Sequence, residues 1–191
     1  GYASQGRSFY QGADSLPPGH ALRVKPGSAP QVWRWWDPDT TPDSSRSFED
    51  WRDEIAAVLE DSVRIRLRSD VPVGAFLSGG VDSSTVVALM SRQVRPVRTF
   101  TVTMSDPAFN EASYARAVSA ALGTEHEEAV VEPAAAAALP ALVWHFGEPC
   151  ADSSAGPPFH LSAAARKRLP VVLHGAGGDD GHAGYEWHPS T

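Results

Sequence analysis

The chain has 191 residues, of which 42% are hydrophobic, and a formal net charge of −7. This length and composition suffice for one α/β core and a small appendage. The negative charge argues against binding to a phosphate backbone, so nucleic acid is not an expected partner. A single cysteine excludes an internal disulfide and is compatible with a reducing, cytoplasmic location. No run of about 18 apolar residues occurs, so we expect no membrane partner.

The N-terminal part predicts a small antiparallel element. Residues 1–15 are polar and glycine-rich, and a proline-rich turn then leads into an alternating stretch at 21–24. A second short strand, at 31–36, contains Trp33, Trp35 and Trp36. Three tryptophans in four residues favour burial against a partner. A stray hairpin is the alternative.

A linker and a long helix follow. Residues 37–46 are dominated by Asp, Pro, Thr and Ser, which is typical of a linker. Ser47 and Asp50 then form a capping-box-like pair at the start of a helix. Its apolar residues fall on one face: Phe48, Trp51, Ile55, Val58, Leu59, Val63 and Leu67. Arginines at 64, 66 and 68 crowd its last turns, where they either contact a nucleotide or are solvated helix charges.

The most informative stretch is FLSGGVDSS at 76–84. An apolar run at 73–77 precedes it and helix-forming residues at 85–93 follow, which predicts a strand, a tight glycine loop and a helix. Backbone N–H groups in such a loop and the dipole of the helix favour an anion. Gly79 and Gly80 allow a phosphate to approach the backbone. Hydroxyl donors come from Ser78, Ser83 and Ser84, and Asp82 can reach Mg²⁺.

No lysine follows these glycines, so the stretch is not the G-x-x-x-x-G-K-[ST] loop. Backbone groups, hydroxyls and a metal must then neutralise the phosphate charge. A serine-rich cap on an ordinary surface helix is the alternative. The complete S-G-G-x-D-S-S pattern behind an apolar strand favours phosphate binding.

The remaining chain alternates between strand and helix patterns. Strands are predicted at 98–104, 126–131 and 171–174, and helices at 111–122, 133–145 with an interruption at Pro140, and 159–168. This alternation predicts a doubly wound parallel α/β sheet. Ligands bind at the carboxyl ends of such strands, so the loops after Leu77, Val102 and Leu173 should converge on one crevice.

A glycine-rich acidic segment closes the pattern at 174–184. Asp179 facing Asp82 would provide two carboxylates for Mg²⁺, and a flexible acidic turn is the alternative. Three histidines in or near this segment suggest zinc, but their spacing is not a standard ligand pattern: His174, His182 and His188.

Three blocks of sequence support a resemblance to a known family. They are VPVGAFLSGGVDSS at 71–84, FGEPCADSS at 146–154, and VVLHGAGGDD at 171–180 followed by AGY at 183–185. The first resembles the pyrophosphate loop of the ATP-pyrophosphatase superfamily. Together they resemble the synthetase domain of glutamine-hydrolysing asparagine synthetases, from about residue 16 to the end. The resemblance implies an adenine nucleotide alpha hydrolase-like fold.

The same resemblance implies a domain organisation. Residues 1–36 look like the end of a glutaminase domain, 37–46 like a linker, and 47–191 like a synthetase domain truncated at its C-terminus. The chain begins with Gly1 rather than Met, and we expect it to be a piece of a longer protein. The family's glutaminase uses an N-terminal cysteine, so this chain should not hydrolyse glutamine. Ammonia would come from the rest of the glutaminase domain. The resemblance leaves open whether the protein forms a homodimer.

The family resemblance also implies a site for ATP and Mg²⁺. Val102 lies where the family's backbone meets adenine, although a core valine is the alternative. In the family, one segment lies near the α-phosphate and near the acceptor carboxylate, such as that of aspartate. In this chain that segment corresponds to Asp152, Ser153 and Ser154. Asp82 and Asp179 are expected to be catalytic and to bind the metal. The full cofactor-binding set is Leu77, Ser78, Gly79, Gly80, Asp82, Ser83, Ser84, Val102, His174 and Gly175.

The acidic segment departs from the family motif Ser-Gly-acid-Gly-x-Asp-Glu. His174 replaces the serine, Ala176 the first acid and Asp180 the final glutamate. In asparagine-forming members that first acid is thought to act in amide formation, and alanine cannot transfer a proton. Relatives that close β-lactams or macrolactams vary at this position.

Two kinds of function therefore remain open. The first is an ATP-dependent amide ligase of the asparagine synthetase type, with a β-lactam or macrolactam cyclase as a variant. The second is a non-catalytic nucleotide-binding remnant of a synthetase. Ala176 and the absence of a later helical region, from which relatives supply a lysine, favour the second for this chain alone. We expect the isolated chain to make no asparagine.

Overall fold

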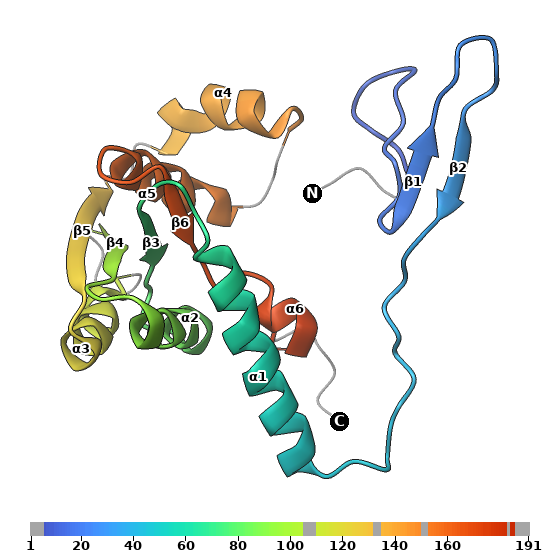
Figure 1. Cartoon of the computed structure of the whole chain (residues 1–191). Helices are drawn as coiled ribbons and strands as arrows, with labels where there is room; N and C mark the ends of the chain where they lie inside the picture. Colours follow the sequence, from blue (N-terminus) through green and yellow to red (C-terminus); the bar gives the residue numbers. More distant parts are fainter. Residues whose placement is uncertain (1–5, 105–109, 132–134, 150–152, 183, 186–191) are drawn as a thin grey trace. The chain divides into compact units, whose positions relative to one another are not determined.

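In the computed structural model the chain forms two compact units. The N-terminal unit comprises Gly1–Ser47 and Ala136–Ser153, and the sheet unit comprises Phe48–Ala135 and Ser154–Thr191. The expected linear limits would place 136–153 in the synthetase domain, whereas the structure groups it with the N-terminal unit. The described residues are 6–104, 110–131, 135–149, 153–182 and 184–185 (Figure 1).

A two-stranded antiparallel hairpin forms part of the N-terminal unit, as the sequence predicts. Strand β1 (His20–Arg23) pairs with β2 (Gln31–Arg34) in a register that joins His20 to Arg34. The tryptophans are not buried as expected. They are 43%, 68% and 57% exposed at Trp33, Trp35 and Trp36. The described unit offers these rings no apolar layer, and Arg23 lies over the Trp33 ring at 5.5 Å instead.

Helix α4 (Ala135–Phe146) belongs largely to the same unit and corrects one prediction. It runs through Pro140, where the sequence predicts an interruption. Proline removes one backbone donor and strains the preceding turn, but the surrounding alanines and leucines are strong helix formers. Ala138 and Leu142 are buried, and Tyr10 donates its hydroxyl hydrogen to the Gly147 carbonyl oxygen at 2.5 Å just beyond the helix.

The sheet unit contains a four-stranded parallel sheet in the order β5-β4-β3-β6. Its strands match the predicted strands within one residue: β3 (Val73–Phe76), β4 (Arg98–Met104), β5 (Glu125–Val131) and β6 (Val171–Leu173). The chain passes from β3 through β4 to β5 and then returns to the other side of β3 for β6. The strand order therefore reverses between β3 and β6, the place where ligands bind in sheets of this kind.

Helices cover both faces of the sheet, which confirms the doubly wound fold (Figure 1). On one face lie α2 (Val81–Gln93) and α3 (Ala112–Leu122). Their core includes Val87, Met90 and Ala115 packed with Ala75 and Leu77. On the other face lies α5 (Gly156–Arg166). Its core is formed by Phe100, Leu161, Ala165 and Leu169.

Three helices begin earlier or elsewhere than predicted. Helix α2 begins at Val81 rather than Thr85, so it includes part of the serine-glycine motif. Helix α5 begins at Gly156 rather than at 159, because prolines in its first turn need no backbone donor there. A short helix, α6 (Gly178–His182), forms where the sequence predicts a glycine loop.

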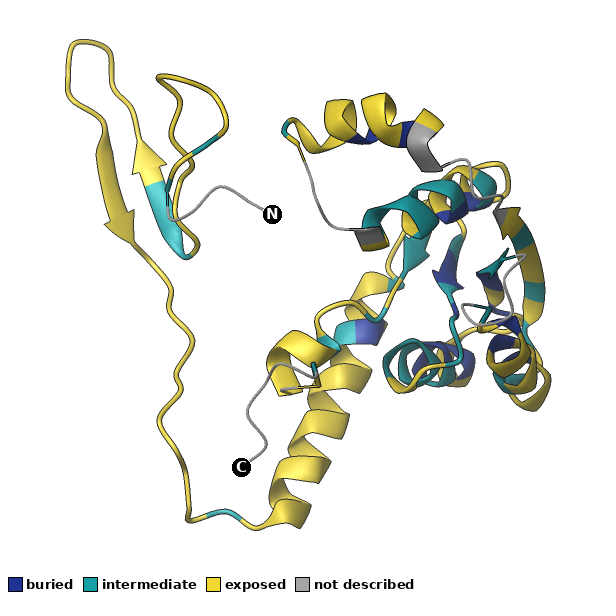
Figure 2. Cartoon of the chain, turned by 180° about the vertical axis from the view of Figure 1, so that it is seen from behind, coloured by how far each residue is buried: buried dark blue, intermediate teal, exposed yellow. Residues whose placement is uncertain are grey.

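Helix α1 (Phe48–Arg66) forms as expected, but most of its apolar face stays exposed. Val63 is buried, whereas Phe48 is 77% and Val58 60% exposed. Figure 2 shows α1 almost entirely in the colour of exposed residues. Only the C-terminal end of the helix therefore contributes to the core of the sheet unit. Among the described helices, none combines the length and the apolar character needed to cross a membrane.

Candidate functional site

The serine-glycine loop follows β3 and is held by its own hydrogen bonds. The Ser78 amide donates to Ser83 Oγ at 3.2 Å, and the Gly80 amide donates to Ser78 Oγ at 3.2 Å. The two hydroxyls lie 2.9 Å apart. Gly79 adopts a left-handed φ of +88°, which glycine tolerates and other residues rarely adopt. These contacts fix the loop without using any side chain from outside the motif.

Helix α2 starts within the motif, so its first turn carries Asp82, Ser83 and Ser84. This turn is the positive end of the helix dipole, where an anion is favoured. The Ser84 amide makes the first helical bond, to the Gly80 carbonyl oxygen at 3.0 Å. Ser84 Oγ is buried without a hydrogen-bond partner in the described part of the chain. Ser84 thus places an unused polar atom beside the loop.

A pocket of about 710 Å³ opens at the carboxyl ends of β3 and β4, and we call it the main pocket. This volume lies within the range of small-molecule sites. Eight of the predicted residues line it: Leu77, Ser78, Asp82, Ser83, Val102, Ser154, His174 and Gly175. Gly79, Gly80 and Ser84 are not among its described lining residues, and they shape the loop behind it.

One wall of the main pocket is apolar. Phe76, Val102 and Leu161 line it together with Pro157 and Pro158 from the start of α5. A flat aromatic base suits such a wall, because apolar and proline surfaces are easily dehydrated.

Sequence patterns did not single out Pro157, Pro158, Ser162 or Glu111 as lining residues. No local signal in the sequence separates these residues from other residues at the start or in the middle of a helix. They become part of the pocket only because α3 and α5 pack on the sheet beside β4.

The segment after β6 packs closely against the start of α2. A Cβ on Gly175 would lie 2.7 Å from the Asp82 carbonyl carbon and 2.8 Å from the Ser83 nitrogen. A Cβ on Gly178 would overlap the Asp82 carboxylate, with its Cγ only 2.5 Å away. The two glycine-rich segments are therefore in contact, and glycine is required at 175, where the neighbouring atoms belong to the backbone of α2, whereas a side chain at 178 would displace only the Asp82 carboxylate.

Asp82 and Asp179 differ in their positions. Asp82 lines the main pocket from the first turn of α2, whereas Asp179 lies in the first turn of α6. The Asp179 carbonyl oxygen accepts a hydrogen bond from the Gly184 amide at 3.1 Å.

Within the described ranges no three His, Cys, Asp or Glu side chains come together as a metal site. One or two carboxylates suit Mg²⁺, which usually completes its shell with water and substrate phosphates. The arrangement does not supply the ligand set of a structural zinc site.

The predicted acceptor segment is only partly described. Asp152 lies outside the described residues, and Ser153 begins a 3-10 helix (Ser153–Ala155). Ser154 lines the main pocket. Ala176 lines the pocket as well, and its amide donates to His174 Nδ1 at 3.3 Å. The position that carries an acid in the family motif therefore faces the site, with a methyl group in place of a carboxylate.

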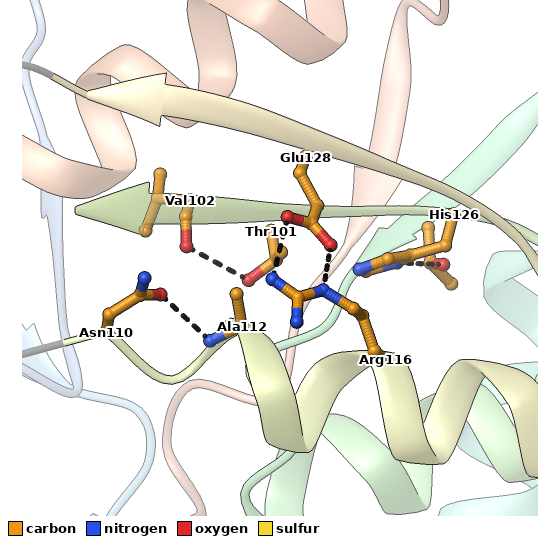
Figure 3. Close-up of polar contacts among 8 residues, drawn as sticks. Thr101, Val102, Asn110, Ala112, Arg116, His126 and Glu128 are labelled. Carbon is orange, nitrogen blue, oxygen red and sulfur yellow. Dashed lines mark hydrogen bonds and ion pairs between the residues drawn. The ribbon is translucent and has the colours of Figure 1, made fainter. Parts of the chain in front are cut away.

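A polar network ties α3 to the strands beside the main pocket (Figure 3). Arg116 on α3 donates to both carboxylate oxygens of Glu128 on β5, at 2.6 and 3.3 Å. This hydrogen-bonded pair lowers the pKa of Glu128 and raises that of Arg116. The Ala112 amide donates to the Asn110 side-chain oxygen at 3.1 Å, a local contact in the turn that leads into α3. These contacts fix the helix whose N-terminal end borders the pocket through Glu111.

The burial of His126, which lies on β5 in the same network, predicts that folding stability depends on pH. Its Nδ1 lies 2.9 Å from Thr99 Oγ1, and its Nε2 is buried without a described partner. Burial lowers the pKa of His126 below its ordinary value of 6.5, while Glu128 opposes and Arg116 adds to that shift. As the pH falls below about 6.5, the unfolded chain binds a proton that the folded chain still excludes, so folding stability decreases.

We therefore expect the stability of the wild-type chain to fall more steeply between pH 7 and pH 5 than that of His126→Gln. Denaturant unfolding at several pH values would measure the difference. Glu128 does not change folding stability between pH 7 and pH 5, because its pKa is lowered from 4.5. Its contribution to stability is therefore lost only at more acidic pH. Parallel stability curves for the two proteins would contradict a buried neutral His126.

The doubly wound sheet, with a serine-glycine loop at the reversal of strand order, defines a class of α/β domain whose ligands bind at the carboxyl ends of the strands. The family model for asparagine synthase matches residues 54–191. The chain belongs to the asparagine synthase family. This finding confirms the resemblance drawn from the three sequence blocks.

Individual relatives agree with that assignment. A putative glutamine-hydrolysing asparagine synthetase of Mycobacterium tuberculosis is 38% identical over 96% of this chain. Asparagine synthetase 1 of Bacillus subtilis is 40% identical over 69% of the chain. Amidase chyE of Penicillium rubens is 30% identical over 95% of the chain. The matches cover only 29%, 21% and 30% of these relatives, so the chain spans less than a third of their lengths.

Proposed function

We propose that this chain forms the nucleotide site of an ATP-dependent amide ligase, which adenylates a carboxylate and releases pyrophosphate before amide formation. One observation carries the proposal: the serine-glycine loop at the strand reversal and the apolar wall at Val102 line the same pocket. A nucleoside can lie on that wall while its phosphates reach the loop and the first turn of α2.

The proposed reaction has two steps. A carboxylate oxygen of the acceptor bonds to the α-phosphorus of ATP, the bond from that phosphorus to the bridging oxygen breaks, and pyrophosphate leaves. An amine or ammonia nitrogen then bonds to the acyl carbon, AMP leaves with the bonding electron pair, and the nitrogen loses a proton. Positioning and charge stabilisation account for most of the catalysis in such transfers.

The described residues have separate roles in this proposal. Backbone amides and the hydroxyls of Ser78 and Ser83 would orient the phosphates. Asp82, with Asp179 as its proposed partner, would hold Mg²⁺, which supplies positive charge to the phosphate oxygens when bound. Ser154 faces the same pocket and would position the acceptor carboxylate near the α-phosphate, whereas His174 and Gly175, which also line it, would contact the nucleotide. Asp152 and Ser153 remain proposed contributors to acceptor binding.

For the whole protein we propose aspartate or a similar carboxylate as acceptor, with ammonia released from glutamine by a glutaminase domain. Ala176 favours two other candidates. One is a cyclase that closes a lactam, and the other is a nucleotide-binding domain that catalyses no reaction. Ala176 lines the pocket where the family motif has an acid, and a methyl group cannot act as a general acid or base.

The test separates nucleotide binding from chemistry. The 191-residue chain is mixed with Mg·ATP, each candidate carboxylate and free ammonia, and pyrophosphate, AMP and amide are measured. For the isolated chain we expect ATP binding without asparagine from aspartate, and carboxylate-dependent pyrophosphate release would show that the chain also adenylates an acceptor. Binding without pyrophosphate release would favour the non-catalytic domain, and asparagine at ordinary enzyme rates would show that Ala176 is compatible with that reaction. Absence of ATP binding would refute the proposal.

A further inference from the structure

Glu111 brings an unpaired carboxylate to the main pocket from the start of α3. Its side chain is exposed and makes no capping hydrogen bond to the helix. Each glutamate on β5, in contrast, is paired with an arginine: Glu125 with Arg98, Glu127 with Arg168 and Glu128 with Arg116. The described lining of the main pocket contains no lysine or arginine that could pair with Glu111 in the same way. Both oxygens of its carboxylate are therefore available to a ligand.

The backbone of α3 fixes Glu111 beside the serine-glycine loop. The Glu111 carbonyl oxygen accepts hydrogen bonds from the Tyr114 amide at 3.0 Å and the Ala115 amide at 3.3 Å, which closes the first turn of the helix. The same turn packs on the loop, because a Cβ on Gly79 would lie 2.5 Å from the Tyr114 carbonyl carbon. Glu111 therefore lies within one helical turn of the residues that contact the loop.

The two faces of the sheet supply different walls of the main pocket. Phe76, Val102 and Leu161 belong to the apolar layer between the sheet and α5, and they form the wall proposed for the base. Glu111 comes from α3, which covers the opposite face and packs on the loop proposed for the phosphates. The ribose joins the base to the phosphates. It therefore crosses the pocket between the apolar wall and the loop, on the side that Glu111 borders.

The chemistry of a carboxylate restricts which part of a nucleotide it can bind. An ionised carboxylate accepts hydrogen bonds through two oxygens and donates none. Phosphates offer it no donor and repel it, whereas the two neighbouring hydroxyls of a ribose offer two donors side by side. In dinucleotide-binding α/β folds, an acidic residue about 20 residues beyond the glycine loop binds a ribose hydroxyl in this way. Glu111 follows β4, the second strand of the sheet along the chain.

We propose that Glu111 binds the 2′- and 3′-hydroxyls of the nucleotide ribose and so makes the site selective for ribonucleotides. This inference rests on the proposed function, because it names a further contact to the same nucleotide. Hydrogen bonds to an ionised acceptor are stronger than those between neutral groups. A nucleotide without these hydroxyls leaves the carboxylate without its donors and binds more weakly.

The experiment compares Mg·ATP with Mg·2′,3′-dideoxyATP, which lacks both hydroxyls, by calorimetry on the 191-residue chain. We expect wild type to prefer ATP by at least about 10-fold, and Glu111→Ala to reduce this preference by about 10-fold. The ratio of the two affinities is the measurement, because removing a negative charge changes the binding of both nucleotides alike. Glu111→Asp keeps the charge on a shorter side chain and should retain part of the preference. The control Glu60→Ala removes the same charge from α1, outside the described lining of the main pocket, and should retain all of it.

Other outcomes would overturn this inference and leave the proposed function intact. The inference is wrong if wild type binds both nucleotides equally well, or if Glu111→Ala keeps the full preference for ATP. Equal weakening of ATP and dideoxyATP binding in Glu111→Ala would assign the carboxylate to the metal or the base. Weaker binding of aspartate with unchanged binding of both nucleotides would assign it to the ammonium group of the acceptor. If wild type binds neither nucleotide, the proposed function and this inference both fail.

Discussion

Replacing Gly79 by alanine is expected to lower the free energy of unfolding of the sheet unit by about 3–5 kcal/mol. Gly79 has a φ of +88°, and a Cβ there would lie 2.5 Å from the Tyr114 carbonyl carbon and 2.6 Å from the Ala115 nitrogen. These are backbone atoms of α3, which cannot move aside as a flexible side chain would. The strained conformation and the overlap with α3 therefore act together.

Gly123→Ala is the matched control for this change. Gly123 ends α3 with a φ of +67°, but a Cβ there meets nothing within 4 Å. Only the cost of the left-handed conformation should appear, about 1 kcal/mol. Urea unfolding of both variants would measure the difference. Equal destabilisation would mean that the serine-glycine loop does not pack against α3 as closely as described.

Removing the Asp82 carboxylate is expected to have the largest effect on function. If Asp82 holds Mg²⁺ beside the phosphates, Asp82→Ala should weaken Mg·ATP binding by at least about 100-fold, because the loss of a direct ligand exceeds the 10–100-fold typical of an outer-shell partner. The response of ATP affinity to added Mg²⁺ should also disappear. Calorimetry with and without Mg²⁺ measures both effects, and equal binding by wild type and variant would remove Asp82 from the site.

Gly178→Ala tests the same carboxylate without removing it. A Cβ on Gly178 would lie 2.5 Å from Asp82 Cγ, so the carboxylate would have to turn away. We expect Mg·ATP affinity to fall by about 10-fold, while stability changes little because the displaced group is the end of a side chain. Gly181→Ala, in the same short helix, adds a Cβ with nothing within 4 Å and should leave affinity unchanged. Identical affinities in both variants would contradict the contact between Gly178 and Asp82.

The elements of the sheet unit were predictable from the sequence because their signals are local. Apolar runs predict β3 and β4, and the alternation of strand and helix predicts a doubly wound sheet. The S-G-G-x-D-S-S pattern likewise predicts a loop at the carboxyl end of the first parallel strand, where Ser78 and Asp82 now line a pocket. Each of these inferences needs only residues that are close along the chain.

Local signals failed where competing preferences had to be weighed. Pro140 predicts a break, yet α4 continues because the neighbouring residues favour a helix. The glycines at 175–184 predict a loop, yet Gly178–His182 forms a helical turn next to Asp82. The apolar stripe of α1 predicts burial, yet most of it is exposed in the structure. Periodicity shows that a helix has an apolar face but does not identify what covers it.

The sequence by itself determined the class of fold, the family and the loop that defines the candidate site. Only the tertiary structure decided which distant residues share that site, such as Glu111 and Pro157 in the main pocket. The physical reason is that strand order and helix packing bring together side chains far apart along the chain. Nothing in the local pattern around Glu111 records that α3 packs on the sheet beside β4.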